Sequence, residues 1–324
     1  MYIYIHAVIF FLLHLTLMYA FSSDYFISTY AGYTVNNYDK RGDGDIAQAA
    51  TISMPYGIHV DEFNNIFLTE SQFIRRIDGS TKLISTYAGG GDDSTTNDIF
   101  ATAAYLPFPY GVAGDTAGNI YYADSTLSCV RKISAGICRV STVVGECGTS
   151  GVSSNANSGL AIRLLQPRGL FYYSPDNVMY IADSSNHVVL AFYVNSNRVV
   201  VVAGLVGLGG YSSDGIATSE TLWRPSDVFV DSLQNLYIAD TDNQRVRFVS
   251  NSTKVMSTVA GTGSFGSTGD GAAATSATIF SPSSVCLDAS GNMLIFSIVD
   301  NQVRVVSNGI ITTPVGSASQ VGLT

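Results

Sequence analysis

The feature that most constrains the fold of this chain is a short sequence that returns at a nearly fixed interval. It starts at a proline and reads PYGIHVD, PYGVAGD, PRGLFYY, PSDVFVD and PSSVCLD, with copies 54 to 58 residues apart. The five prolines are Pro55, Pro109, Pro167, Pro225 and Pro282. A repeat of this period is one supersecondary unit that cannot bury its apolar face alone, so neighbouring units must stack. The sequence therefore predicts a repeat array.

Each unit contains four short runs of strand-forming residues. In the fourth unit they are DVFVD (227–231), NLYIAD (235–240), RVRFV (245–249) and VMSTVAG (255–261), separated by Gly, Asn, Asp and Ser turns. Only 13% of residues are charged and 31 are glycine, which suits short strands joined by turns. Four strands per unit predict the blade of a β-propeller. A small residue follows each proline by two positions, as expected for the innermost strand near the axis: Gly57, Gly111, Gly169, Asp227 and Ser284.

Glycine-rich connectors follow the fourth run, the clearest being AGTGSFGSTGDGAAATSATIFSP (260–282). The order of proline, strand, GNxYxAD, NxRVR, STVAG and GDGxxATxA resembles the NHL repeat family. The resemblance is to the long-connector form seen in teneurin-like and bacterial sensor propellers, and it covers residues 26–316. Two connectors depart from the pattern. The connector that follows the second unit lacks Asp-Gly and reads ECGTSGVSSNANSGLAIRLLQP, and the connector that follows the first unit reads GGGDDSTTNDIFATAAYLPFP.

The number of blades follows from the copies of each run. Five proline-led units accompany six copies of the fourth run, since YFISTYAG (25–32) precedes the first unit. We therefore expect an all-β propeller of four-stranded blades, with five complete repeats and one extra N-terminal strand. The resemblance implies six blades and favours an incomplete six-bladed plan. The alternative is five blades with the first strand spare at an edge. The propeller is expected over 25–316, followed by a short tail at 317–324.

The N-terminal segment predicts export. Residues 7–17 are almost entirely apolar and the first charge is Asp24, which is typical of a signal peptide over 1–20 or of a signal anchor. We expect a secreted or cell-surface protein, associated with a membrane only if this segment is retained. Asn251 begins Asn-Ser-Thr and fits a glycosylation acceptor.

The four cysteines add little to this expectation. Three of the four, Cys129, Cys138 and Cys147, fall in one repeat, where one disulfide is expected in an oxidising compartment. Cys286 lies in an apolar run and is expected to be a buried thiol.

Residues that recur once per blade receive a structural interpretation, because equivalent positions around a ring cannot converge on one ligand. The carboxylates at the end of the second run are expected to accept N–H bonds in the turn before the third. They are Asp124, Asp183 and Asp240, with Glu70 and Ser297 at the same position in the other units. Arginines of the third run are expected to make contacts between blades or at edges. They are Arg75, Arg131, Arg247 and Arg304, with Leu190 in the third unit.

The sequence offers few candidate residues for binding a metal ion or a cofactor. Aspartates of the glycine-rich connectors are weak calcium candidates, although turn chemistry explains them as well. They are Asp43, Asp45, Asp214 and Asp270. The tripeptide Arg-Gly-Asp at 41–43 is a still weaker integrin-type motif. No cofactor is expected.

Catalysis is also poorly supported. Related propellers that act as amidating lyases hold zinc with several histidines, whereas only His59 and His187 follow the N-terminal segment. The chain has no G-x-S-x-G motif. We expect no enzyme activity, with a metal-assisted lyase or hydrolase as the alternative.

The favoured hypothesis is a non-catalytic extracellular propeller that acts as a scaffold for a protein or glycan ligand. The net charge of −9, without a cluster of Lys or Arg, argues against nucleic acid. Loops at one mouth should carry specificity. The aromatic residues Tyr211, Trp223 and Phe265 of the connectors are the candidate contact residues.

Overall fold

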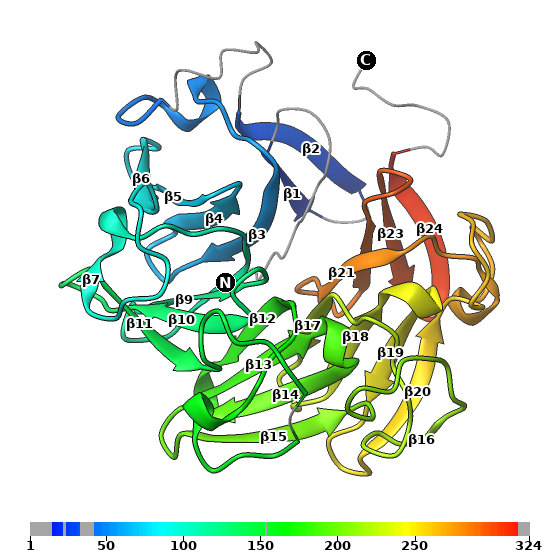
Figure 1. The fold of residues 1–324 in the computed structure, drawn as a ribbon. Coiled ribbons are helices and arrows are strands. Elements are labelled where there is room, and N and C mark those ends of the chain that lie inside the picture. The colour runs from blue at the N-terminus through cyan, green and yellow to red at the C-terminus, as the bar shows by residue number, and fades with distance from the viewer. Residues whose placement is uncertain (1–14, 22–23, 33–41, 153, 317–324) are drawn as a thin grey trace.

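Five antiparallel sheets, each with four main strands, are arranged side by side around a common axis (Figure 1). The structure is a computed structural model that describes residues 15–21, 24–32, 42–152 and 154–316. Each sheet is one blade, and its four main strands run in sequence order from the axis outwards. The predicted β-propeller is therefore confirmed.

The first three blades begin at three of the predicted prolines. Blade one comprises β3 (Pro55–Val60), β4 (Ile66–Glu70), β5 (Phe73–Ile77) and β6 (Ile84–Ala88). Blade two comprises β8 (Pro109–Gly114), β9 (Ile120–Asp124), β10 (Cys129–Ile133) and β11 (Arg139–Val144). Blade three comprises β12 (Pro167–Tyr173), β13 (Val178–Asp183), β14 (Val188–Tyr193) and β15 (Arg198–Ala203).

The last two blades follow the same plan. Blade four comprises β17 (Asp227–Val230), β18 (Leu236–Asp240), β19 (Arg245–Val249) and β20 (Val255–Ala260). Blade five comprises β21 (Pro282–Leu287), β22 (Met293–Ser297), β23 (Gln302–Ser307) and β24 (Ile310–Val315). The helices are single 3₁₀ turns: η1 (Ala47–Ala49), η2 (Ala101–Ala103), η3 (Gly159–Ala161), η4 (Ser174–Asp176), η5 (Ser184–Asn186), η6 (Thr241–Asn243) and η7 (Ala274–Ser276).

The small residue after each proline lies where inner strands of neighbouring blades approach most closely. A Cβ on Gly111 would stand 2.3 Å from the carbonyl oxygen of Arg168, and one on Gly57 would stand 2.5 Å from that of Tyr110. Neither glycine has a positive φ, so the close approach, rather than the backbone conformation, requires glycine. The position predicted to crowd the axis is confirmed.

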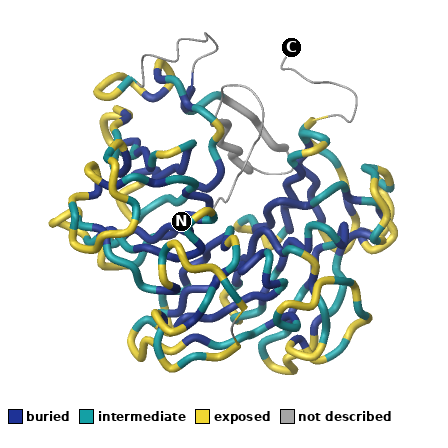
Figure 2. The backbone as a smooth tube through the Cα atoms, viewed as in Figure 1, coloured by how far each residue is buried: buried dark blue, intermediate teal, exposed yellow. Residues whose placement is uncertain are grey.

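The apolar core lies between the blades. Strand residues are buried and the connecting loops are exposed (Figure 2). One cluster joins Ala123 and Val130 of blade two to Ile181 and Leu190 of blade three, and all four are fully buried. Burial of one such aliphatic side chain contributes about 1.5–3 kcal/mol, so each blade depends on its neighbours.

The connectors cover the outer edge of each blade. Two of them add a short fifth strand, β7 (Ile99–Phe100) on β11 and β16 (Gly215–Ile216) on β20. The others bond in the same place, as where the Gly271 N–H donates to the Ile311 carbonyl at 2.8 Å. Because an unpaired edge promotes association with other chains, this cover protects the rim.

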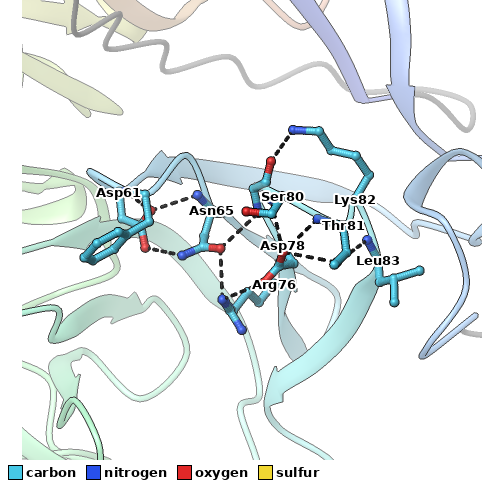
Figure 3. A network of polar contacts seen from close by, with 10 residues as sticks. Asp61, Asn65, Arg76, Asp78, Ser80, Thr81, Lys82 and Leu83 are labelled. Carbon is cyan, nitrogen blue, oxygen red and sulfur yellow. Dashed lines mark hydrogen bonds and ion pairs between the residues drawn. The ribbon is translucent and has the colours of Figure 1, made fainter.

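The turns between strands one and two, and between strands three and four, share one end of the blades, called here the hairpin face. Asp61 accepts the N–H groups of Phe63 and Asn65, and Asn65 in turn accepts the N–H of Gly79 from the other turn (Figure 3). The same Asp–Asn pair recurs in other blades as Asp115–Asn119, Asp231–Asn235 and Asp288–Asn292. These side chains bind the turns by Asx-type hydrogen bonds.

The extra N-terminal strand exists, but the expected six-bladed plan is wrong for the described residues. Strand β2 (Asp24–Ala31) pairs with β1 (Leu15–Phe21) in a separate two-stranded sheet. Figure 1 draws this hairpin on the side of the ring where blades one and five face each other. Its end is attached to the connector of blade one, since the Gly32 N–H donates to the Ala47 carbonyl at 2.9 Å. A partner two residues away costs little loop-closure entropy, which favours this hairpin over a distant blade.

The rest of the N-terminal segment and the predicted tail lie outside the described residues, as residues 1–14, 22–23 and 317–324. Within the described part, no helix is both long and apolar enough to cross a membrane.

Candidate functional site

The connectors and the turns between strands two and three meet at the other end of the blades, called here the connector face. This arrangement follows from antiparallel strands, because the chain enters strand one and turns from strand two at the same end. Loops on such a face are positioned by a rigid scaffold and are free to carry specificity.

Buried arginines of strand three attach the connectors to the blades. Arg75 pairs with Asp43 at 2.6 Å, Arg304 with Asp270 at 2.7 Å, and Arg247 with Asp214 at 3.6 Å. The three arginine side chains are at most 1% exposed. The Asp-Gly motif of a connector is therefore the ionic partner of the arginine in the blade that follows it. The predicted edge contacts of these arginines are confirmed.

Blades two and three, which lack this ion pair, support the same link between connector and arginine. In blade two, where the connector is altered, Arg131 donates to the carbonyl oxygens of Ser94 and Thr96 at 2.8 and 2.5 Å. In blade three the connector lacks Asp-Gly, and Leu190 replaces the arginine. Unit three, taken with the connector that leads into it, is the one unit of the sequence that lacks both the Asp-Gly motif and the arginine, and this joint loss was a signal for the pairing.

The carboxylates at the end of strand two hold the loop that enters strand one. Asp183 accepts the N–H of Leu165 at 2.8 Å and Asp240 accepts that of Trp223 at 2.7 Å. Glu70 likewise accepts the N–H of Ser53. The structural role is confirmed, but the donors stand two residues before the proline rather than in the turn before strand three.

Asp124 differs from the other recurring carboxylates in that it bonds within the turn before strand three, besides its backbone hydrogen bond from Phe108 in the loop that enters strand one. It accepts the N–H of Leu127 at 2.9 Å, within the turn that precedes strand three. This is the arrangement predicted for all the carboxylates at the end of strand two.

Burial dominates the electrostatics of these carboxylates. Removal from water raises the pKa of Asp183 and of Asp240 to about 7, despite hydrogen bonds that lower it. Burial also raises the pKa of Asp124 to about 6. Since a buried carboxylate with a raised pKa favours its neutral form, these groups connect fold stability to pH.

The weak calcium candidates are not brought together. Asp43, Asp214 and Asp270 belong to three connectors and pair with arginines of three blades. The backbone carbonyl of Asp45 accepts the N–H of Ile84 at 2.9 Å, and its side chain is exposed. The Asp-Gly motifs are explained by these loop contacts.

The two histidines also lie apart. His59, on β3, packs against Gly114 of the next blade, where a Cβ would stand 2.3 Å from its Nε2. The Nδ1 atom of His187 accepts the N–H of Arg224 at 3.1 Å. No group of three His, Cys, Asp or Glu side chains among residues 15–21, 24–32, 42–152 and 154–316 is placed to hold a metal ion.

A cleft of about 490 Å³ opens on the connector face. Its lining comes from the turn between strands two and three of blade two and from the loops that enter strand one of blades two, three and four. Arg168 and Arg224 line it, together with the hydroxyl groups of Ser125, Thr126 and Ser150. Convergent polar groups from several loops are typical of a binding site.

The walls of the cleft are braced by hydrogen bonds. The Ser125 hydroxyl donates to the Pro167 carbonyl, and the Gln166 N–H donates to the Ser128 hydroxyl at 3.4 Å. These bonds join blade two to blade three beneath the opening. The Cys129–Cys147 disulfide lies beside the same wall, next to the lining residues Ser128 and Gly148. The cleft is therefore built before any ligand arrives.

Phe108, which lines the cleft, belongs to a group of neighbouring aromatic rings. The rings of Tyr56 and Phe108 are 4.6 Å apart, and those of Tyr56 and Tyr110 are 5.1 Å apart. The guanidinium of Arg168 stands 5.3 Å from the centre of the Tyr110 ring. This contact fixes an arginine against an aromatic face at the edge of the opening.

The predicted aromatic contact residues all lie on connectors and are exposed by 50%, 46% and 68%, in the order Tyr211, Trp223 and Phe265. The guanidinium carbon of Arg245 stands 3.8 Å from the centre of the Tyr211 ring, and the centres of the Phe265 and Phe280 rings are 5.4 Å apart. Trp223 directly precedes the cleft residue Arg224. Among the described residues, no ring contact joins these three side chains to one another.

The cleft residues were not singled out from the sequence, although one signal pointed to them. The residues that flank each proline are mostly apolar, aromatic or serine, and Arg168 and Arg224 depart from that pattern. An arginine that breaks a repeat at an axis-facing loop is a candidate for ligand contact.

The remaining predictions concern the surface and the thiols. One disulfide forms among the three clustered cysteines, between Cys129 and Cys147, while Cys286 is a buried thiol and Cys138 an exposed one.

Asn251 lies in the turn before β20, where its side-chain amide donates to the Leu233 carbonyl at 3.2 Å. Its glycosylation stays a prediction.

Comparisons with known proteins agree with the fold. A family model described as the Teneurin NHL domain matches residues 90–268. NHL repeat-containing protein 2 of Bos taurus is 26% identical over 301 residues, which cover 82% of this chain and 40% of that protein. Human teneurin-4 is 29% identical over 231 residues, which cover 64% of this chain and 8% of that protein. The chain spans less than half the length of these two relatives.

A solved structure of virginiamycin B lyase from Staphylococcus aureus superimposes with a TM-score of 0.52 at 12% identity, over 93% of this chain and 83% of that one. At this identity the likeness shows the propeller fold alone.

Proposed function

Because this chain belongs to the NHL repeat family, with the teneurin NHL domain model covering residues 90–268, we propose that it is a non-catalytic extracellular propeller that binds a protein or glycan ligand on its connector face.

The cleft on the connector face carries this proposal. It is wide enough, at about 490 Å³, for a few sugar units or a short peptide side-chain cluster, and residues from three blades surround it. Its arginines and hydroxyl groups supply directional hydrogen bonds, while its walls are already fixed by bonds between blades. Such a preformed site binds without a large cost for ordering loops.

The extracellular location is supported by two further features. The Cys129–Cys147 disulfide ties β10 to the connector after β11, and disulfides of this kind persist outside the reducing cytosol. The apolar run of residues 7–17 is typical of an export signal.

The exposed aromatic residues extend the proposed surface. Trp223 precedes Arg224 at the cleft, and Tyr211 lies in the same connector. Large aromatic side chains lose little conformational entropy on binding and often dominate an interface. We therefore assign Trp223 and Tyr211 to the ligand contact, with Phe265 in the next connector.

A binding screen tests the function. The full chain would be immobilised and probed with an array of oligosaccharides and a panel of cell-surface ectodomains, with each ligand recovered and checked for chemical change. Trp223→Ala and Tyr211→Ala should weaken the selected interaction about tenfold or more. The control is Leu233→Ala, since Leu233 is 72% exposed on the hairpin face; it should change affinity less than twofold. Turnover of the ligand, or loss of binding only in the Leu233 variant, would overturn the proposal.

A further inference from the structure

The charge of the cleft differs from that of the whole chain. Its lining contains two arginines and no Asp or Glu, in a protein whose net charge is −9. A local excess of positive charge in a concave, partly desolvated site attracts anions more strongly than an exposed charge does. We propose that this cleft binds a sugar unit that carries a carboxylate or sulfate group, held by Arg168 and Arg224. The proposal rests on the proposed binding function and deepens it by naming the ligand class.

The Arg168 guanidinium is oriented by its neighbours and is available to bind an anion. Its guanidinium stands over the Tyr110 ring and forms no ion pair with a carboxylate in the described part of the chain. The buried arginines of strand three, by contrast, are occupied by connector aspartates or carbonyl groups. Stacking fixes the plane of the Arg168 guanidinium, which lowers the entropy lost when it forms a bidentate bond to an oxyanion.

Arg224 is only weakly paired. Its Nη1 atom stands 3.9 Å from a carboxylate oxygen of Asp242, with side chains 43% and 35% exposed. An exposed pair at this distance contributes little, so a ligand anion in the cleft can replace it. The backbone of Arg224 is nevertheless fixed, because its N–H bonds to His187 and it has a left-handed φ of 50° before Pro225.

The other lining groups favour a sugar over an acidic peptide. The hydroxyl groups of Thr126 and Ser150 have no hydrogen-bond partner in the described structure, and they come from two neighbouring loops of the cleft lining, joined where the Gly148 N–H donates to the Leu127 carbonyl at 2.8 Å. Small hydroxyl groups can donate to or accept from the many hydroxyls of a sugar ring. Phe108 offers an apolar face beside them. An extended peptide would instead need an open strand edge or a groove of alternating pockets, whereas this cleft lies among loops.

The test compares charged and neutral oligosaccharides of equal length. Calorimetric titrations of the full chain would use a heparin-derived tetrasaccharide, tetragalacturonate, a neutral maltotetraose and an acidic glutamate peptide. One or both charged sugars should bind, the neutral sugar should bind at least tenfold more weakly, and affinity should fall as salt rises. Comparison of the heparin fragment with the galacturonate separates sulfate from carboxylate recognition.

Variants assign the binding to the cleft. Arg168→Gln and Arg224→Gln should each weaken binding of the charged sugar roughly 10- to 100-fold. Arg168→Lys should restore part of the loss, because it keeps the charge without the planar fork. Arg139→Gln is the matched control, since Arg139 lies on the rim against Phe100, outside the cleft. Thermal unfolding of each variant would show that the fold is retained.

The outcomes separate this inference from the proposed function. If maltotetraose binds as tightly as the charged sugars and the arginine variants bind it normally, the acidic-sugar inference is wrong while glycan binding stands. Arg168-dependent binding of the glutamate peptide alone would likewise overturn the inference and leave a protein-binding scaffold. Chemical conversion of a bound sugar would contradict the non-catalytic function without contradicting the ligand class.

Discussion

At the scale of single residues, the buried arginines of strand three connect loops to blades. Arg304 is 1% exposed and donates to Asp270 and to the carbonyl groups of Thr278 and Thr268. It therefore satisfies three acceptors of one connector. A buried charge with this many partners is costly to remove, because its acceptors lose their bonds while the loop stays in place.

Replacement of Arg304 by Leu should lower the free energy of unfolding by about 2–4 kcal/mol. Leu is the natural residue at this position in blade three, so side-chain size alone does not account for the loss. Asp270→Ala should cost less, about 1 kcal/mol, since Asp270 is 49% exposed. Urea unfolding would measure both, with Arg198→Gln as a surface control within about 0.5 kcal/mol, because the Arg198 side chain is exposed. An unchanged midpoint for the Arg304 variant would contradict the anchoring role.

The buried carboxylates predict a pH dependence of stability. Burial raises the pKa of Asp183 from 3.8 to about 7, so the folded chain holds this proton more tightly than the unfolded chain. Its stabilising contribution is complete below pH 3.8 and is lost as the pH rises through about 7. The difference in unfolding free energy between pH 5 and pH 8 should therefore be smaller in Asp183→Asn than in the wild-type chain.

Urea titrations at several pH values would measure this difference. Asp98→Asn provides the control, because the Asp98 side chain is 81% exposed. Parallel pH profiles for the wild-type chain and for Asp183→Asn would argue against a raised pKa at this site.

Single residues were partly predictable from the sequence. Recurrence once per blade correctly indicated structural roles for Asp183, Asp240 and the strand-three arginines. The Asp-Gly partner of the arginines could have been inferred from their paired loss in unit three, whereas the N–H donors to Asp183 and Asp240 lie 18 and 17 residues away along the chain and only the fold brings them together. The cleft was missed for a similar reason, since its two arginines come from different blades.

At the scale of elements, the inner strands show how closely the blades approach. Gly111 of β8 faces the backbone of β12, and the Gly169 N–H donates at 2.9 Å to the carbonyl of Ser226, which directly precedes β17. Backbone-to-backbone packing of this kind leaves no room for a side chain. In blades four and five the same position holds Asp227 and Ser284, whose side chains bond to each other at 2.5 Å.

Gly111→Ala should therefore destabilise the chain by about 3 kcal/mol or more, since the new Cβ would meet backbone atoms at 2.3 and 2.8 Å. Gly151→Ala is the control, because its Cβ would only reach the Arg163 side chain at 3.2 Å; about 1 kcal/mol or less is expected there. Thermal and urea unfolding would compare the two. Equal effects would mean that the close approach at the axis is relaxed in solution.

The elements themselves were well predicted. The third run of unit four, RVRFV, coincides with β19 (Arg245–Val249), and the other three runs of that unit differ from their strands by one residue. Alternating apolar residues and Gly or Asn turns define such strands locally. The 3₁₀ turns and the fifth strands of the connectors were not predicted, because connector residues show no strand periodicity and pair only across the blade.

At the scale of the whole molecule, the blades form a chain of contacts. The inner strands meet in the order β3, β8, β12, β17 and β21. Blade three therefore has a neighbour on each side, whereas blade five packs against blade four. Because stability in repeat proteins is a sum of unit and neighbour terms, blades with fewer neighbours should open more readily.

Hydrogen exchange should show this gradient. Amides of β13 and β14 in blade three are expected to exchange at least tenfold more slowly than those of β22 and β23 in blade five. Mass spectrometry of peptides from the two blades would measure the rates, with the exposed turns as an internal reference. Uniform protection of both blades would indicate that the ring unfolds as a single cooperative unit.

The place of the extra N-terminal strand could not be predicted from the sequence. Repeat counting correctly gave five complete units, but the role of the strand at 25–32 depended on which edge it would join. A strand carries the same local pattern in a hairpin as in a blade, so its pairing with β1 was not encoded in that pattern.

In blades one, four and five an ion pair attaches the connector to the blade that follows it, so the structural unit of this ring is a blade together with its upstream connector. A cut at a proline would separate Asp214 from Arg247 and Asp270 from Arg304, whereas a cut just after the fourth strand, at Gly204 or Gly261, would keep each pair together. Protein engineers who wish to transplant or duplicate a blade should therefore carry its upstream loop with it. The proline marks where the repeat is easiest to read, and the glycine marks where the molecule can be divided.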